Sequence, residues 1–351
     1  MPAMDFAPNF LSNNDVDWAI NRPLITHNVF QRVMEGSAIL GQGFFPVEPI
    51  AGTNSTIDNF VGDTDNAVDQ NSGESVDSSG LVYDEVEVKV DPWITSAHQI
   101  RKDQDLLSML DPNSDVNRLQ GWKIAQKADE RHIVSLVASA RTASKTKEGY
   151  VIHEGGTRVV RGGVASREVA YPLNSTGAYN LMTDIETVCR RLQEKAIDGP
   201  ITALCDPYLL SVMAQDKTIF DITYSPNNPN SLIDRRVVRA NGVNFRFANR
   251  RLGSGRYVTN ITDNLKPGVQ KYNIDLSVGG SAGQPVMLLW AGAPETGVSP
   301  IKTLMAVPLF VDRQVNTNKI TTEVYSRMLM GVGVFHPQNA AELAVSTGAT
   351  V

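Results

Sequence analysis

The stretch from residue 44 to residue 92 constrains the fold more than any other feature of the sequence, because two strand-like segments flank a long polar one. Residues 44–61 read as one strand, and residues 81–90 read as the other, in which valines alternate with charged side chains. Residues 62–80 between them are dominated by Asp, Asn, Ser, Gly and Gln, which favour turns over core. The pattern predicts a long projecting β-hairpin. Because a two-stranded ribbon is marginally stable alone, we expect it to rest on something outside its own domain.

Charge is distributed unevenly along the chain. Its 351 residues carry a net charge of −6, which argues against a protein whose main task is to bind phosphates, since that affinity comes from many Lys and Arg side chains. Residues 46–92 hold eleven acids against one base, a net charge of −10, whereas residues 235–256 hold seven arginines and no acid. Two interpretations remain open. The segments form two separate solvated surfaces, or they meet between copies of the chain, where complementary charge fixes partner and register.

A long helix follows the predicted hairpin. Residues 111–114 supply a proline break and a polar N-cap, and from there to about residue 143 the chain contains no proline and one glycine. A helix over 114–143 would span roughly 40 Å. Because polar residues such as Asp129 and His132 interrupt its apolar stripe, we expect it to lie on a sheet as a beam rather than inside a core.

A unit of mixed helix and strand comes next. Thr183 and Glu186 match a capping box for a helix that Asp-Gly-Pro closes at residues 198–200. Residues 201–205 read as a buried strand, and Pro207 is suited to the first position of another helix. Later segments favour strands, at residues 243–247, 286–290, 304–311 and 320–334. We expect these last long strands to complete a sheet begun before the long helix.

Residues 1–45 contain scattered apolar side chains, three prolines and little periodicity, which predicts an extended arm with short helical turns. Such an arm needs a surface to lie on, and its own domain and another subunit are equally good candidates. The longest apolar run, residues 286–291, is far shorter than the roughly 20 residues of a membrane helix. No basic region followed by an apolar run marks a secretory signal. We therefore expect no membrane partner, and folding where the chain is made.

No pattern in the sequence supports catalysis or cofactor binding. The chain lacks a nucleophile elbow and a phosphate-binding loop, and its five histidines show no metal-ligand spacing. An acid–base pair of His132 with Asp129 is conceivable, but a surface pair is the better interpretation. Cys205 beside Asp206 is interpreted as a small buried thiol rather than a nucleophile. The two cysteines match no CxxC pattern, so we predict a protein that is not an enzyme and has no cofactor, metal or disulfide.

The order of these elements resembles that of the major capsid proteins of short-tailed, coliphage-type double-stranded DNA bacteriophages, whose fold is shared with phage Hong Kong 97 and herpesvirus shells. One local similarity is Ile-Thr-Ala-Leu-Cys-Asp-Pro at residues 201–207, a strand that ends in Cys-Asp-Pro before a helix. The other is residues 325–342, with Met-Gly-Val-Gly, His-Pro and Ala-Ala in that order. The resemblance is collinear from about residue 45 onward. The sequence departs from the family in its short arm, in the polar tip at 62–80 and in the Asn- and Pro-rich loop at 227–231.

The resemblance implies an α+β, Hong Kong 97-like capsid fold. The implied parts are an N-terminal arm (1–45), an extended β-hairpin loop (46–92), a peripheral domain with the spine helix (93–170), an axial α/β domain (171–300), and return strands that complete the peripheral domain with a C-terminal tail (301–351). The resemblance also implies a virion protein, made in the host cytoplasm, that self-assembles into the pentamers and hexamers of an icosahedral shell. Its implied partners are portal and scaffolding proteins and packaged DNA, bound without sequence specificity.

Within such a shell we expect the acidic hairpin to dock on basic residues of the next subunit. The candidate contact residues are Asp63, Asp65, Asp69, Glu74 and Asp77 on the hairpin, and Arg235, Arg236, Arg250 and Arg251 on the acceptor, with Arg141, Lys145 and Lys147 as second choice. The arginines could instead face the genome. Two rival interpretations stay open: a nanocompartment shell of the same fold that encloses a cargo enzyme, and an enzyme or tail component that remains monomeric.

Overall fold

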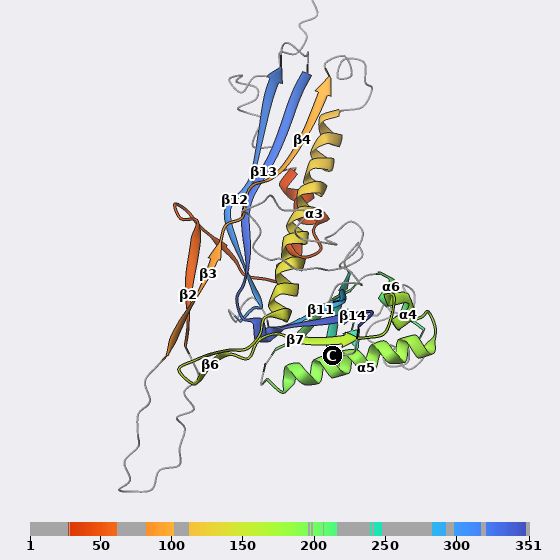
Figure 1. The fold of residues 1–351 in the computed structure, drawn as a ribbon. Helices are drawn as coiled ribbons and strands as arrows, with labels where there is room; N and C mark the ends of the chain where they lie inside the picture. The colour runs from red at the N-terminus through yellow and green to blue at the C-terminus, as the bar shows by residue number, and fades with distance from the viewer. Residues whose placement is uncertain are drawn as a thin grey trace, which may run out of the picture.

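A long helix and two sheets dominate the computed structural model of the chain (Figure 1). The structure describes residues 27–61, 82–101, 112–215, 239–247, 283–292, 298–316 and 321–348, apart from the single positions 28, 196, 198, 206 and 241. Within these ranges no helix is long and apolar enough to cross a membrane.

The long helix is α3, Pro112–Arg141, with 30 residues and thus a length of about 45 Å. It begins and ends two residues before the expected bounds of 114–143. Pro112 stands at its first position, where the missing N–H costs no hydrogen bond. In Figure 1 the helix runs along a sheet with long strands.

This sheet has the strand order β1-β12-β13-β4. β12 (Ile301–Asn316) and β13 (Thr321–Val334) form a long antiparallel hairpin. β4 (Ile94–Arg101) pairs antiparallel with β13, and β1 (Val47–Pro49) pairs parallel with β12. The final long strands therefore complete a sheet with strands that precede the helix, as the sequence predicts.

Helix α3 is buried over its C-terminal part, which corrects the expected beam on a sheet surface. Residues 132–140 are all buried, and polar side chains on the helix bond to backbone carbonyls of β13. The Nε2 of Gln120 donates to the carbonyl of Val324 (2.7 Å), and the hydroxyl of Ser135 donates to that of Val332 (3.3 Å). Polar residues therefore occur on the buried side of the helix, where they hydrogen-bond to the backbone of β13.

Asp129 and His132 are likewise buried, at 2% and 1% exposure, so the expected surface pair is wrong. The carboxylate of Asp129 accepts hydrogen bonds from the hydroxyl of Ser37 (2.5 Å) and the amide of Ala38 (2.8 Å). The Nε2 of His132 lies 3.0 Å from the hydroxyl of Thr303 on β12. Each side chain therefore fixes a different segment of the chain to the helix.

The chain before β1 packs on its own core. A helix over 29–36 and a 3-10 turn, η1 (Leu40–Gln42), place Val29 and Val33 in one apolar cluster with α3. The second half of the predicted arm thus lies on its own domain, which is one of the two surfaces that we considered. Residues 1–26 lie outside the described part of the chain.

The second sheet has six strands in the order β7-β14-β11-β8-β10-β9. Three of them fall where the sequence predicts strands. The bounds are β7 (Thr157–Arg161), β8 (Ile201–Cys205), β9 (Arg239–Ala240), β10 (Val243–Phe247), β11 (Gln284–Ala291) and β14 (Ala340–Val345).

Two of these strands depart from the expected division of the chain. β14 pairs parallel with β7 and antiparallel with β11. The stretches at 157–161 and 340–345 were expected beside the spine helix, within 93–170 and 301–351, but they join the six-stranded sheet. After β13, which lies in the four-stranded sheet, the chain therefore crosses to the six-stranded sheet and forms β14 there.

Helices α4 (Arg167–Ala170), α5 (Ser175–Gln193) and α6 (Pro207–Met213) pack with the six-stranded sheet. Pro207 opens α6 as predicted. The capping box proposed for Thr183 is wrong, because α5 already begins at Ser175, and the side chain of Asn174 accepts from the Gly177 amide (2.8 Å). Asn is as good an N-cap as Thr, so the earlier cap determines where the helix starts.

The six-stranded sheet is covered on both faces, which explains the continuous apolar run of β11. Leu288 and Trp290 point into the cluster around α3, and Met287 and Leu289 point into the cluster under α5 and α6. The ring of Trp290 lies 5.1 Å from that of Phe45. One apolar core thus continues from the spine helix onto the second sheet.

Candidate functional site: the hairpin and its socket

Strands β2 (Ser55–Val61) and β3 (Tyr83–Lys89) form an antiparallel hairpin beside the four-stranded sheet (Figure 1). The single strand expected over 44–61 is two strands, because β1 belongs to the main sheet and the hairpin begins at residue 55. Burial alternates along β3 as predicted. We call the more buried face, with residues 56, 58, 60, 84, 86 and 88, the inner face, and the opposite one, with residues 57, 59, 83, 85 and 87, the outer face.

Lys302 on β12 binds two carboxylates that come from different sheets. Its Nζ lies 2.5 Å from the carboxylate of Glu48 on β1 and 2.8 Å from that of Asp58 on the inner face. Burial disfavours the charged lysine, but the hydrogen bonds to Asp58 and Glu48 outweigh it and raise the pKa of Lys302. Because the lysine side chain is only 12% exposed, this ion pair is screened less than a surface pair.

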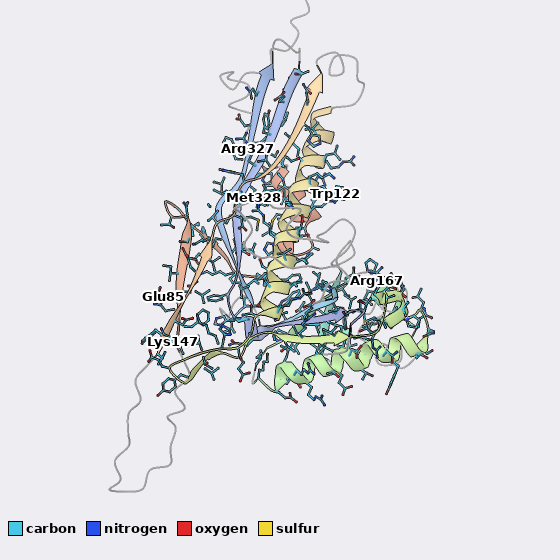
Figure 2. All side chains as sticks on the ribbon, in the orientation of Figure 1. Glu85, Trp122, Lys147, Arg167, Arg327 and Met328 are labelled. Atoms are coloured by element: carbon cyan, nitrogen blue, oxygen red, sulfur yellow. The ribbon has the colours of Figure 1, made fainter. Side chains whose placement is uncertain are left out.

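A second, smaller hairpin contacts the first at the end of its described strands that is nearer to the tip. It consists of β5 (Lys145–Lys147) and β6 (Tyr150–His153). The Nζ of Lys145 lies 2.5 Å from the carboxylate of Asp84, and that of Lys147 donates to the carbonyl of Tyr83 (2.5 Å). The hydrogen bond from Lys145 lowers the pKa of Asp84. Figure 2 shows Lys147 at the lower end of the hairpin, near Glu85.

An aromatic cluster holds the inner face between these two ionic contacts. The ring of Phe60 lies 5.4 Å from that of Phe335 and 4.7 Å from that of His336, both edge-on. Val82 and Ile152 complete the cluster. Burial among these groups lowers the pKa of His336, so the neutral imidazole is the form that suits this contact.

Two glycines on β13 let β3 cross it at close range. A Cβ atom on Gly331 would lie 2.2 Å from the carbonyl oxygen of Lys89, and one on Gly333 would lie 2.6 Å from a methyl carbon of Val88. Both distances are far shorter than any real contact, so a side chain at either position would push the hairpin away. The Met-Gly-Val-Gly motif therefore has a structural reason: it forms a notch for the hairpin.

We call these groups together the socket: Lys145, Lys147, Lys302, Gly331, Gly333, Phe335 and His336. The socket belongs to the same chain as the hairpin. The inner face of the ribbon therefore rests on other parts of its own chain, and not on the neighbouring copy that we expected to receive the hairpin. The tip of the hairpin, residues 62–81, lies outside the described residues.

The outer face has no such support among the described residues. Ile57 is 60% exposed and Tyr83 is 51% exposed, and Glu85 and Glu87 lie beside them on the same face. The outer face thus carries two large apolar side chains and two acids, of which Glu87 pairs with Lys89 on the same face (2.9 Å). Sequence reasoning did not single out Ile57 or Tyr83, although the alternation of β3 places Tyr83 opposite the valines and so predicts its exposure.

The candidate contact residues chosen from sequence fall outside the described part of the chain. This holds for Asp63, Asp65, Asp69, Glu74, Asp77, Arg235, Arg236, Arg250 and Arg251. Of the basic segment, the structure describes Arg246, which is exposed and lies 5.6 Å from the ring of Phe44. The second-choice lysines bind the hairpin of their own chain, and Arg141 binds Glu342.

The side chains considered for catalysis are buried. Cys205 is fully buried, and burial raises its pKa to about 12, so the thiol is not a nucleophile near neutral pH. Its interpretation as a buried thiol is confirmed. Among the described residues, no group of three or more His, Cys, Asp or Glu side chains could hold a metal ion.

Comparison with known proteins gives structural matches only. No family model matches the chain, and no curated protein matches its sequence. Solved structures of capsids match nearly its whole length. The cyanophage P-SCSP1u capsid has a TM-score of 0.68 at 14% identity, and covers 89% of this chain and 89% of its own. The mature capsid of bacteriophage PhiM1 has a TM-score of 0.62 at 17% identity, over 88% and 87%.

The capsid of a native GTA particle matches with a TM-score of 0.53 at 10% identity, over 88% of this chain and 90% of its own. Each of these three matches covers 88% or 89% of this chain. At identities this low the likeness establishes architecture. The chain has the α+β, Hong Kong 97-like fold of phage capsid proteins.

Proposed function

We propose that this protein is the major capsid protein of a double-stranded DNA bacteriophage, and that it self-assembles through pentamers and hexamers into the icosahedral shell of the virion. Its role is structural rather than enzymatic. The proposal is supported by the capsid fold over nearly the whole chain and by the sequence resemblance to short-tailed phages. Portal and scaffolding proteins are the partners that such a shell requires, and the DNA inside is bound without sequence specificity.

The observation that carries the proposal is a hairpin with one face fastened to its own chain and the other face exposed, which we call the two-sided hairpin. Its inner face is fastened by ion pairs, aromatic contacts and a glycine notch, whereas its outer face exposes Ile57 and Tyr83 beside two glutamates. A ribbon so firmly held on one side presents the other side as a rigid, preorganised surface. Large apolar side chains ringed by charge are typical of protein–protein contacts, so the outer face is suited to a neighbouring copy.

Charge complementarity indicates which surface of the neighbouring copy receives the hairpin. The hairpin segment carries a net charge of −10, and residues 235–256 carry seven arginines without an acid. Oppositely charged surfaces of this kind steer association and fix register. We propose that the basic segment of the next subunit, with Arg235, Arg236, Arg250 and Arg251, receives the hairpin and its acids Asp63, Asp65, Asp69, Glu74 and Asp77. An arginine segment turned toward the genome is the competing arrangement.

Negative-stain microscopy of the expressed full chain tests the proposal. We expect closed shells, or rings of five and six subunits, together with a large assembly in analytical ultracentrifugation. A stable monomer at high concentration would contradict the proposal and favour an enzyme or tail component. Particles purified from the infected host that contain a cargo protein and no DNA would instead support a nanocompartment.

A further inference from the structure

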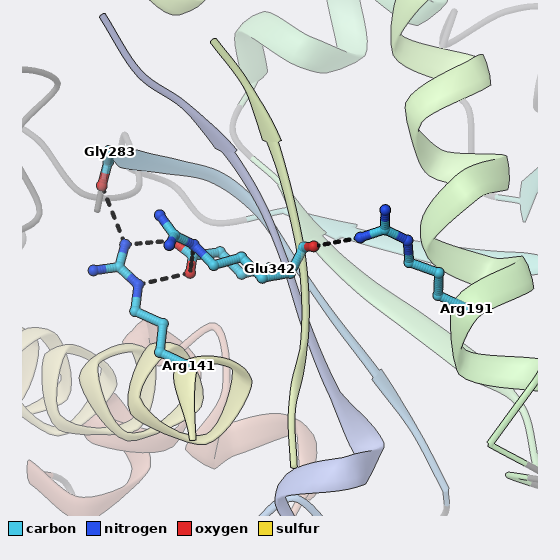
Figure 3. Close-up of polar contacts among 5 residues, drawn as sticks. Arg141, Arg191, Gly283 and Glu342 are labelled. Atoms are coloured by element: carbon cyan, nitrogen blue, oxygen red, sulfur yellow. Dashed lines mark hydrogen bonds and ion pairs between the residues drawn. The ribbon is translucent and has the colours of Figure 1, made fainter. Parts of the chain in front are cut away.

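A buried cluster of charged side chains joins the two halves of the molecule. Arg141, in the last turn of α3, binds Glu342 on β14 through two hydrogen bonds, from Nε (2.7 Å) and from Nη2 (2.5 Å). The same Nη2 donates to the carbonyl of Gly283, next to β11 (3.1 Å). The Nε of Arg158 on β7 lies 3.4 Å from the carboxylate of Glu342. Figure 3 shows these groups between α3 and the strands.

The cluster continues through the sheet to the opposite layer. Arg191 on α5 donates from Nη1 to the backbone carbonyl of Arg158 (2.8 Å). In Figure 3, α3 and α5 lie on opposite sides of β7 and β14. Polar contacts thus link the spine helix, the six-stranded sheet and the helix behind it.

The carboxylate of Glu342 lies in a buried place where a charge is energetically unfavourable. The side chain of Glu342 is fully buried, those of Arg141 and Arg158 are 12% and 26% exposed, and the neighbours of Glu342 along β14 are Ala341 and Leu343. An apolar residue would fill such a site at lower cost, because a buried ion pair loses hydration that its attraction barely restores. Packing alone therefore does not explain the glutamate.

The directionality of the arginine–carboxylate pair explains the presence of Glu342 better than packing does. The rest of the junction consists of apolar contacts, such as Leu288 and Trp290 against the cluster around α3, and apolar surfaces tolerate small rotations without losing much contact. A bidentate arginine–carboxylate pair does not, since its two parallel hydrogen bonds require one relative orientation. The pair lies at the end of α3, where a rotation between the halves would displace its atoms directly.

We propose that Arg141, Glu342 and Arg158 form a clamp that fixes the angle between two halves: the spine half, α3 with the four-stranded sheet, and the six-stranded-sheet half. If the chain is a shell subunit, as proposed above, this angle contributes to the curvature of the particle, and the clamp restricts assembly to one size. The angle itself is a property of the single chain, so it can be measured whether or not shells form.

The test is a distance measurement between the halves by pulsed electron paramagnetic resonance. Spin labels are attached at Thr95→Cys on β4 and Glu186→Cys on α5, which are both exposed, and labelled protein is diluted with unlabelled protein. The native cysteines Cys189 and Cys205 are buried. We expect one narrow distance distribution for the parent chain and a broadened or split one for Glu342→Gln, which keeps the shape of the side chain but removes its charge.

Two further variants distinguish a clamp from simple loss of stability. Arg141→Lys keeps the charge but loses the bidentate geometry, and it should broaden the distribution even if Glu342→Gln does not fold. Val212→Ala in α6 opens a cavity in the core of the six-stranded half, away from the junction, and should destabilise the chain while leaving the distribution narrow. Equal widths in the parent chain and Arg141→Lys, or equal broadening by Val212→Ala, would overturn the proposal.

Where shells form, the particle diameters give a second readout. Arg141→Lys should produce a wider range of diameters than Val212→Ala does. Failure of the parent chain to assemble would contradict the proposed capsid role but not the clamp, because the distance measurement needs no shell.

Discussion

His132 shows how a single buried side chain couples this fold to pH. Its Nδ1 lies 2.8 Å from the carbonyl of Ala128, its Nε2 lies 3.0 Å from the hydroxyl of Thr303, and it is 1% exposed. Burial disfavours the charged imidazolium and lowers the pKa of His132 to about 4, although the bond to Ala128 acts in the opposite direction. The folded chain therefore binds this proton less readily than the unfolded chain, whose histidines have a pKa of about 6.5.

The resulting pH dependence has a definite sign. Because the folded pKa is the lower one, the neutral histidine contributes its full stability above pH 6.5, and the contribution is lost as the pH falls toward 4. A difference of this size corresponds to roughly 3 kcal/mol of unfolding free energy. We expect urea unfolding of the dissociated subunit to show a steeper loss of stability from pH 6.5 to 4 than that of His132→Gln. Parallel curves for the two proteins would contradict the assignment.

For Asp129 and His132 the interpretation from the sequence was wrong. Asp129 and His132 interrupt an apolar stripe, and such residues in a helix usually face water. Here they bond to Ser37 and Thr303, which are 92 and 171 residues away along the chain. Helical periodicity reports only the neighbours within one helix, so it could not reveal partners of that kind. Cys205 was interpreted correctly because it ends a continuous apolar strand, where burial follows from local pattern alone.

At the scale of elements, the hairpin separates what local pattern can predict from what it cannot. The alternation along residues 81–90 predicted a strand with two faces, which is β3, and the polar segment before it predicted a hairpin with the preceding strand. The socket was not predicted, because its members come from β5, β12 and β13, and from the residues after β13. The motif at residues 330–333 was noted only as a resemblance to the capsid family. Nothing in the sequence indicated that the hairpin would pack against its glycines.

The outer face of the hairpin is tested by reversing its charge. In Glu85→Lys/Glu87→Lys the inner face and the socket stay intact, so the subunit should fold with an unchanged unfolding midpoint. Assembly should fall by about tenfold or more, because like charges would now face a basic partner surface. The yield of particles by sedimentation and the unfolding midpoint by circular dichroism are the two measurements.

A matched control makes the same change of charge elsewhere. Glu186→Lys/Glu194→Lys alters two exposed glutamates, one on α5 and one at its C-cap, and should leave the particle yield close to that of the parent chain. If both double variants lose particles equally, net charge rather than the outer face controls assembly. If neither does, the outer face is not a contact.

At the scale of the whole molecule, the sequence predicted the fold class and the order of elements better than their pairing. The long helix, the final strands and the intervening α/β unit are present in the predicted order. Strands β7 and β14 were not predicted, because both are short, and their place in the six-stranded sheet depends on the pairing of β14 with β11 and of β7 with β14. The clamp at Glu342 depends on the place of β14 in the six-stranded sheet, because β14 carries the glutamate to the end of α3.

The two halves and the hairpin together form a subunit whose parts are fixed before assembly. The clamp fixes one half against the other, and the socket fixes the hairpin against the spine half. A preorganised subunit loses less conformational freedom on association than one that must fold on its neighbour. The two-sided hairpin is then the feature on which contact between copies depends.

A density map of the assembled particle, obtained by cryo-electron microscopy, tests this claim most directly. The account predicts that Phe60 and Asp58 keep their contacts with His336 and Lys302 of the same chain, while Ile57, Tyr83, Glu85 and Glu87 are covered by a neighbouring copy. A map in which the outer face is open to solvent in every subunit, or in which the inner face has left its own socket, would contradict it.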